Sequence, residues 1–266
     1  MPVQFSSPSP NFALSLEGAV ATIAIHNPAK RNAIDLEMWK ALPRIIAMME
    51  EDERVRVIVL RGQGAGAFAS GADISEFETV RADAAGGRLY EAANEAAFRA
   101  IAHCAKPVIA MIRGFCLGGG FGLALACDLR VASDTAVFGI PAAKLGVGYP
   151  PGAMRLVTAA VGGPAARDLF YTARRIGAAE AERLGVVQRV VPDGELEGAA
   201  MALAQEIAGN APLTIRAAKA AIDEALGIAH PGTDPIALAD ACFDSADAVE
   251  GRRAFLEKRA PVFTGR

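Results

Sequence analysis

The chain has 266 residues, of which 52% are hydrophobic and 21% are charged, and its formal net charge is −3 at pH 7. This length and apolar content predict a substantial core, in one large domain or a domain with an appendage. The slight acidic balance disfavours nucleic-acid binding, which needs a basic excess, but a local basic cluster could still bind an anionic small molecule.

The cysteines and histidines form no Cys-x-x-Cys motif and no spacing typical of a zinc site, so we expect no metal and reduced, buried thiols. The N-terminal segment 1–11 lacks the charged start and apolar region of a secretory signal. No apolar run reaches the roughly 18 residues of a membrane span. We therefore expect a cytoplasmic protein without a membrane partner.

Strands and helices alternate in the first part of the chain. Residues 20–26 predict a strand that ends at Asn27-Pro28, and Asp35 is a plausible N-cap for a helix over 36–51, although Pro43 lies inside it. Further strands are expected at 55–60, 107–112, 129–132 and 136–139, and helices at 81–103 and 121–127.

From residue 152 onward, helices dominate and no fixed-period repeat or long linker is visible. The pattern predicts one last strand, at 186–191. Helices are expected at 152–161, 164–172, 178–184, 195–209, 213–226, 235–246 and 251–259.

Three consecutive glycines, Gly118 to Gly120, separate the apolar runs 107–112 and 121–127. Glycine permits a tight turn and a close approach to a ligand, and the first N–H groups of a helix have no internal partner. Such a turn can bind an anion or stabilise an oxyanion, but close packing of helix on strand explains it equally well. A dinucleotide fingerprint fits poorly because Leu123 stands at its sixth position, and no P-loop Gly-Lys-Ser/Thr follows.

A second segment, Ala67-Phe-Ala-Ser-Gly-Ala-Asp-Ile-Ser-Glu-Phe77, follows a strand and the glycine-rich loop 62–67. It too could present backbone N–H groups to a ligand. An ordinary connection between a strand and a helix has the same composition, so this segment alone does not decide between the two interpretations.

The ordered series of motifs resembles the crotonase superfamily, the enoyl-CoA hydratase/isomerase group, from roughly residue 15 to 266. The motifs that carry this resemblance are Asn27-Pro-Ala-Lys-Arg-Asn-Ala33, Ala-Phe-x-x-Gly-Ala-Asp-Ile, a Lys-Pro-Val-Ile-Ala strand, Gly-x-x-x-Gly-Gly-Gly with Ala-Cys-Asp, Phe138-Gly-Ile-Pro141 and the stretch 250–259.

The resemblance implies an α/β fold with a crotonase-like spiral of β-β-α units over residues 1–194. A helical C-terminal region, 195–266, would drive the assembly of a homotrimer or of a homohexamer made of two trimers. The implied substrates are acyl-CoA thioesters, with coenzyme A as part of the substrate and no separate cofactor.

By matching motifs, the resemblance implies an oxyanion hole made by the backbone N–H groups of Ala72 and Gly119. These donors would hold the thioester oxygen as it becomes an enolate, and each can contribute about 10²–10³ in rate. The positions that match coenzyme A contacts are Lys30, Arg31, Ala33, Ala72, Asp73 and Ile74, with Lys258 and Arg259 reaching a neighbouring subunit's ligand. The lysines and arginines among them are equally typical of an ordinary solvated surface.

The chain departs from the family pattern at both glutamates of the hydratases. Gly122 and Ala142 stand at these two positions. Hydration needs one group to take a proton from water and another to deliver one to carbon, and losing such help costs about 10²–10⁴ in rate per group. We therefore expect no efficient hydration by the usual mechanism.

Enolate stabilisation alone suits decarboxylation, because departing CO₂ supplies the electrons. The segment Lys144-Leu-Gly-Val-Gly-Tyr149 is similar to one in methylmalonyl-CoA decarboxylases, where the matching tyrosine lies beside the substrate carboxylate. Those enzymes have a histidine at the position of Ala72, and a loop tyrosine with a packed ring and a wet hydroxyl is the plain alternative. Hydration by a substitute residue, isomerisation and non-catalytic binding of acyl-CoA stay open.

The other polar candidates are expected to have structural roles. Asp73 and Asp128 are interpreted as a cap and a strand anchor, and His103 as a surface or capping residue. Glu76, one helical turn after Asp73, could face the pocket but is more typical of a structural position. RNA binding, which one branch of the superfamily performs through a lysine-rich helix, is not expected because no such helix is present.

Overall fold

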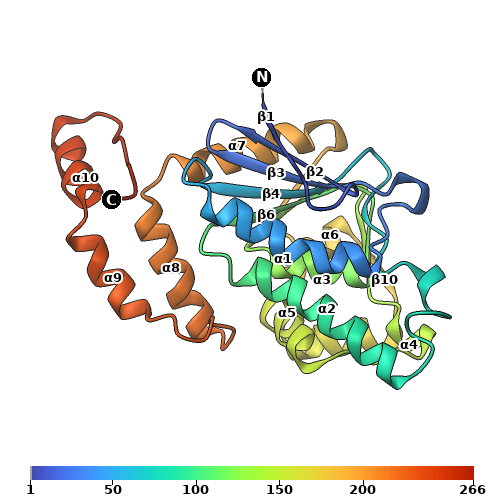
Figure 1. The fold of residues 1–266 in the computed structure, drawn as a ribbon. Coiled ribbons are helices and arrows are strands. Elements are labelled where there is room, and N and C mark those ends of the chain that lie inside the picture. The colour runs from blue at the N-terminus through green and yellow to red at the C-terminus, as the bar shows by residue number, and fades with distance from the viewer. Residues whose placement is uncertain (1) are drawn as a thin grey trace.

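The computed structural model describes residues 2–266 and shows two β-sheets surrounded by helices (Figure 1). The smaller sheet has the order β10 (Arg175–Gly177), β9 (Val137–Gly139), β7 (Phe115–Leu117) and β5 (Ala67–Ala69). The larger sheet has the order β1 (Val3–Phe5), β2 (Phe12–Glu17), β3 (Val20–Ile25), β4 (Val57–Gly62), β6 (Val108–Ile112), β8 (Leu129–Ser133) and β11 (Arg189–Val191).

From β4 to β9, successive strands alternate between the two sheets. β4, β6 and β8 pair in parallel in the larger sheet, while β5, β7 and β9 pair in parallel in the smaller one. Each pair of strands leads into a helix: α2 (Ala84–Ala102), α3 (Gly119–Ala126) and α4 (Ala142–Leu145). The chain therefore follows the expected spiral of β-β-α units, although its sequence shows no repeat.

The central strands of the larger sheet, β3, β4, β6 and β8, are buried on both faces. Along β4, Ile58 and Leu60 belong to the core that includes α1 (Leu36–Glu51) and α2, whereas Val57 and Val59 belong to a second core under α7 (Leu196–Ala208). Figure 1 shows α7 over one face of the sheet and α1 with α3 under the other. Burial on both faces explains why the first four residues of β4 and all of β6 are apolar.

The last three helices form an arm beside the sheets (Figure 1). The arm consists of α8 (Pro212–Ala225), α9 (Pro235–Phe243) and α10 (Ala246–Glu257). Several of its large apolar side chains are exposed, including Phe243, Phe255 and Leu256. The predicted division of the chain into residues 1–194 and 195–266 stays a prediction. In the structure α7 packs on the larger sheet, and the three helices after it make up the arm.

Most predicted elements are confirmed within a few residues. The helices expected at 152–161 and 164–172 form α5 (Pro151–Thr172), which is broken at Gly162 by a φ of +73°. The helix α6 (Ala178–Arg183) also agrees. Sequence patterns missed the strands β1, β2, β5, β7 and β10, the four-residue helix α4, and the 3₁₀ turns η1 (Pro28–Lys30), η2 (Ile74–Glu76) and η3 (Asp193–Glu195).

Among residues 2–266, no helix combines the length and apolar character needed to cross a bilayer.

Candidate functional site

The two glycine-containing bends singled out in the sequence lie against each other. Gly71 has a φ of +110°, and a Cβ atom built there would lie 3.0 Å from the Leu117 carbonyl oxygen and 3.7 Å from the Gly119 nitrogen. Both bends line one cavity of about 90 Å³, which α2 and α4 also border. Residues separated by nearly fifty positions thus form one site, which we call the amide cavity.

Two backbone N–H groups in this cavity have no partner within residues 2–266. The Ile34 nitrogen donates to the Gly71 carbonyl at 2.9 Å, and the Asp73 nitrogen donates to the Ile34 carbonyl at 2.9 Å. Since N–H groups alternate along an extended segment, the Ala72 N–H points away from Ile34. Gly119 begins α3, so its N–H has no carbonyl within the helix.

Each glycine of the triplet has a separate structural reason. Gly118 has a φ of +50°, which favours glycine. A Cβ atom at Gly119 would lie 2.9 Å from the Trp39 ring, and one at Gly120 would lie 2.5 Å from the Ala69 carbonyl oxygen. Close packing and a free amide therefore coexist at this turn, and the two interpretations offered by the sequence are compatible.

The predicted coenzyme A segments, 30–33 and 72–74, are brought together. The Lys30 Nζ atom contacts the Asp73 carboxylate at 2.5 Å and the Ser75 hydroxyl at 2.9 Å. Burial opposes ionisation of Asp73, but the hydrogen bonds from Lys30 and Ser75 outweigh it and lower the pKa of Asp73. The bond to Asp73 raises the pKa of Lys30.

The rest of this predicted set is partly assembled. Arg31 stacks over the Phe115 ring at 5.7 Å, Ala33 is buried, and Ile74 is an exposed apolar residue beside the amide cavity. Lys258, the C-cap of α10, lies on the separate helical arm and not at this site (Figure 1).

Tyr149 lies at the amide cavity. Its hydroxyl oxygen is 3.9 Å from the position of a Cβ atom at Gly118, and its ring packs edge-on against Phe170 with 5.1 Å between centroids. Burial raises the pKa of Tyr149 to about 12. The phenol is therefore protonated at neutral pH and is a hydrogen-bond donor to any anion in the cavity.

Helix α2 adds polar side chains that the sequence interpretation did not single out. Glu91 and Asn94 line the amide cavity, and the Glu91 carboxylate forms an ion pair with Arg81, with 2.5 Å between Oε1 and Nη2. Burial raises the pKa of Glu91, although the Arg81 charge partly offsets this effect. Their three-residue spacing places them on one face of α2, but this spacing alone does not say which face of the helix borders a cavity.

The two positions where the hydratase glutamates are missing have different surroundings. A Cβ atom at Gly122 would lie 2.4 Å from the Phe98 Cζ atom, so the Phe98 ring occupies the space of a side chain at this position. Ala142 is buried and lines the amide cavity. Neither α3 nor α4 places a titratable group in the cavity through these positions.

The structural roles expected for four other polar residues agree with the contacts observed. Asp73 caps η2 by accepting from the Ser75 nitrogen, and Asp128 anchors β6 by accepting from the Val108 nitrogen. The Glu76 carboxylate accepts from the Leu36 nitrogen at 2.9 Å and so caps α1. His103 is the C-cap residue of α2.

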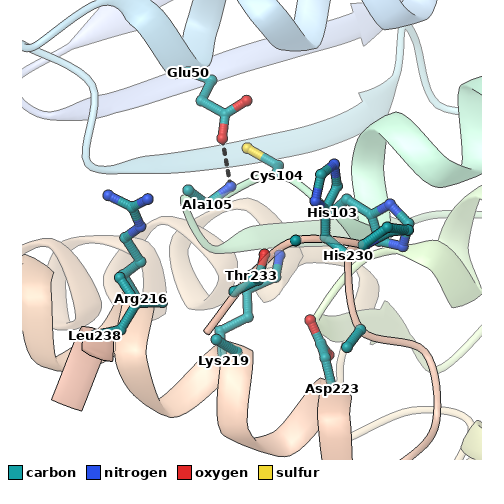
Figure 2. Close-up of a pocket in the computed structure, with 14 residues that line it drawn as sticks. Glu50, His103, Cys104, Ala105, Arg216, Lys219, Asp223, His230, Thr233 and Leu238 are labelled. Atoms are coloured by element: carbon teal, nitrogen blue, oxygen red, sulfur yellow. Dashed lines mark hydrogen bonds between the residues drawn. The ribbon is translucent and has the colours of Figure 1, made fainter. Parts of the chain in front are cut away.

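Besides an open groove of about 780 Å³ along α10, two larger cavities lie away from the glycine turns. One, of about 360 Å³, lies between the end of α1, the loop after α2 and the loop before α9; Figure 2 shows His103 and His230 together at one side of it. The other, of about 440 Å³, has mainly apolar walls and lies beside α8. In residues 2–266, no three His, Cys, Asp or Glu side chains gather as ligands for a metal ion.

The spiral of β-β-α units, with two glycine bends meeting in one cavity, is the crotonase fold. The chain matches the sequence profile described as Enoyl-CoA hydratase/isomerase over residues 15–266, and it belongs to that family.

Proteins similar to this chain have names from the same family. The short-chain-enoyl-CoA hydratase of Clostridium acetobutylicum is 35% identical over 257 residues, which cover 94% of this chain and 95% of the relative. The crotonyl-CoA hydratase of Syntrophomonas wolfei is 35% identical over 256 residues, covering 95% and 97%. The crystal structure of an enoyl-CoA hydratase/carnithine racemase from Magnetospirillum magneticum has a TM-score of 0.91 and 36% identity, covering 99% and 97%.

Proposed function

We propose that this protein acts on acyl-CoA thioesters and uses the Ala72 and Gly119 amides to stabilise an enolate. The observation that carries this proposal is the pair of unpartnered N–H groups at one cavity. Two donors aimed at one oxygen favour the negative charge that develops when the thioester carbonyl becomes an enolate. Family membership and relatives named as enoyl-CoA hydratases support the substrate class.

The coenzyme A part of the substrate is proposed to lie along the segments 30–33 and 72–74. Contacts such as the Lys30–Asp73 ion pair and the hydrogen bond from the Ser70 hydroxyl to the Lys30 carbonyl hold these segments together beside the amide cavity. Lys258 would contribute from the arm of a second copy in a homotrimer or homohexamer. Coenzyme A enters as part of the substrate, and no other cofactor is proposed.

Efficient hydration is not proposed, because Gly122 and Ala142 leave the usual water-activating positions empty of carboxylates. A second candidate reaction is the decarboxylation of a small malonyl-type CoA. The partly buried, protonated Tyr149 at the cavity favours it, since a phenol donor can orient a substrate carboxylate.

The variant Ala72→Pro tests the proposed oxyanion hole, because proline lacks the N–H while Ala72→Ser keeps it as a matched control. The assays are crotonyl-CoA hydration, α-proton exchange of butyryl-CoA and CO₂ release from methylmalonyl-CoA. We expect weak hydration, and a loss of about 10²–10³ in whichever reaction the wild-type protein performs. Equal rates for both variants, with both folded by circular dichroism, contradict the role of the Ala72 amide.

A further inference from the structure

The amide cavity contains one carboxylate among its lining residues in the described chain, that of Glu91. The other titratable groups that line it are Arg81, Tyr90 and Tyr149. Burial raises the pKa values of both tyrosines, to about 12 for Tyr149 and above its ordinary value for Tyr90, so both are fixed donors near neutral pH. Glu91 is therefore the lining group able to take up and release a proton there.

Asn94 places a side-chain amide beside this carboxylate. The Asn94 side chain is only 7% exposed, lines the cavity, and makes no hydrogen bond to any part of residues 2–266. Its Nδ2 atom is 3.5 Å from the position of a Cβ atom at Gly119. The amide atoms are open to the cavity and not sealed off in the core, so they offer a hydrogen-bond donor and acceptor to a ligand oxygen that enters between α2 and the Gly119 N–H.

The face of α2 that carries Glu91 and Asn94 also carries Phe98, which occupies the space next to Gly122 on α3. Glu91, Asn94 and Phe98 are spaced by three and four residues, so they lie along one side of the helix. Phe98 fills the space in front of Gly122, and its ring also packs edge-on against Trp39 with 5.8 Å between centroids. Polar side chains therefore line the cavity from α2, whereas α3 contributes only backbone groups.

Arg81 holds the carboxylate in place. Its guanidinium lies between the Phe77 and Tyr90 rings, 4.6 and 4.7 Å from their centroids, and its Nη2 atom is 2.5 Å from the Glu91 Oε1 atom. The second carboxylate oxygen of Glu91 has no partner in the described part of the chain, so it stays available to a substrate.

We propose that Glu91 is the catalytic proton-transfer residue of this cavity, acting at the carbon next to the thioester carbonyl. Its carboxylate takes a proton from this carbon, the C–H electron pair forms the C=C bond of the enolate, and the carbonyl π electrons move to the oxygen held by Ala72 and Gly119. Return of the proton to the same carbon gives exchange with solvent, and return two carbons further along an unsaturated chain gives isomerisation. This inference rests on the proposed function.

The test uses butyryl-CoA as the probe and the full-length protein in D₂O. Deuterium at the α-carbon is followed by mass spectrometry in the wild type, Glu91→Gln and Glu95→Gln. Glu95 is a matched control, since it lies one turn further along α2 and faces Gly152 of α5. We expect Glu91→Gln to lose about 10²-fold or more in exchange rate, and Glu95→Gln to stay within about threefold because it adds only a nearby charge.

Two further readouts separate catalysis from folding. The dissociation constant for butyryl-CoA, measured by calorimetry, should change less than about threefold in Glu91→Gln if only the chemical step is lost. Arg81→Met should move the rising limb of the pH–rate profile to higher pH, because Arg81 lowers the pKa of Glu91 while burial and the charge of Glu95 raise it. An unmoved limb, or exchange by Glu91→Gln at the wild-type rate, overturns the assignment.

The failure of the broader proposal would look different. If the wild-type protein binds none of the acyl-CoA probes, the proposed function itself is wrong. If the wild type exchanges protons, Ala72→Pro loses exchange and Glu91→Gln keeps it, then the oxyanion hole stands and the role of Glu91 is overturned. Binding without exchange in the wild type also overturns that role.

Discussion

At the residue scale, position 122 shows how one missing side chain changes what a neighbour does. The hydrogen of Gly122 faces the Phe98 ring, and even a methyl group there would approach the Phe98 Cζ atom to 2.4 Å. The contact ties α2 to α3 at the back of the cavity. A carboxylate at position 122 therefore requires a different residue at position 98 as well.

The variant Gly122→Ala should lower the free energy of unfolding by about 1–3 kcal/mol, because an extra carbon in a packed core forces the ring to shift. Gly87→Ala is the control: a Cβ atom at that site in α2 would meet nothing within 4 Å, so a gain of about 0.5–1 kcal/mol is expected. Urea titrations measure both values. A neutral Gly122→Ala variant contradicts the described packing of Phe98.

At the scale of elements, the start of α1 is held from two directions. Asp35 accepts from the Met38 nitrogen at 2.8 Å, and Glu76, in the short turn η2, accepts from the Leu36 nitrogen at 2.9 Å. The same turn carries Asp73, the partner of Lys30. The position of the Ala72 amide therefore depends on a link between η2 and α1.

The variant Glu76→Ala should cost about 1 kcal/mol of stability, as expected for the loss of a helix cap. Burial raises the pKa of Glu76, so folding disfavours its charged form. The resulting loss of stability is complete above the folded-state pKa and disappears as the pH falls below the unfolded-state pKa. Glu76→Gln keeps an acceptor without the charge, so it should be at least as stable as the wild type at pH 7. Thermal unfolding at pH 7 and pH 4 checks this, with exposed Glu78→Ala as the control. A destabilised Glu76→Gln contradicts it.

At the scale of the whole molecule, the helical arm presents apolar surface without a cover within the described chain. Phe243, Phe255 and Leu256 are 74%, 83% and 80% exposed. Exposed apolar patches of this kind are typical of protein–protein contacts. A second copy of the chain is the proposed partner, in keeping with the proposed trimer or hexamer.

Light scattering should give a mass three or six times the 27.6 kDa of one chain. Replacing Phe255 and Leu256 with aspartate should shift the protein to monomers, because two charges would have to be buried in the contact. Arg252→Ala, an exposed change on the same helix, should leave the mass unaltered. A wild-type monomer at micromolar concentration contradicts the proposed assembly.

The sequence allowed the main strands, the helices and the two glycine bends to be predicted because these depend on local patterns. The first four residues of β4 and all of β6 are apolar, and the glycines mark unusual backbone positions. The role of Phe98, and the gathering of Arg81, Glu91 and Asn94 at the cavity, could not be predicted. These depend on which face of an alanine-rich helix packs against α3, and spacing within α2 alone does not determine that.

The alternation of strands between two sheets has a consequence for how such a protein could acquire new chemistry. The bend at Ala72 is held by the pairing of β5 with β7 and by the bridge from Ala72 to Ile34, and the bend at Gly119 follows β7, which pairs with β5 and β9. The point where a carbonyl oxygen would rest is therefore fixed by main chain alone. Reactive side chains instead project from helices that border this fixed point. If the side chains on one of these helices were replaced, the enzyme would keep the backbone site for the thioester oxygen. The new side chains would deliver or remove a proton from a different direction.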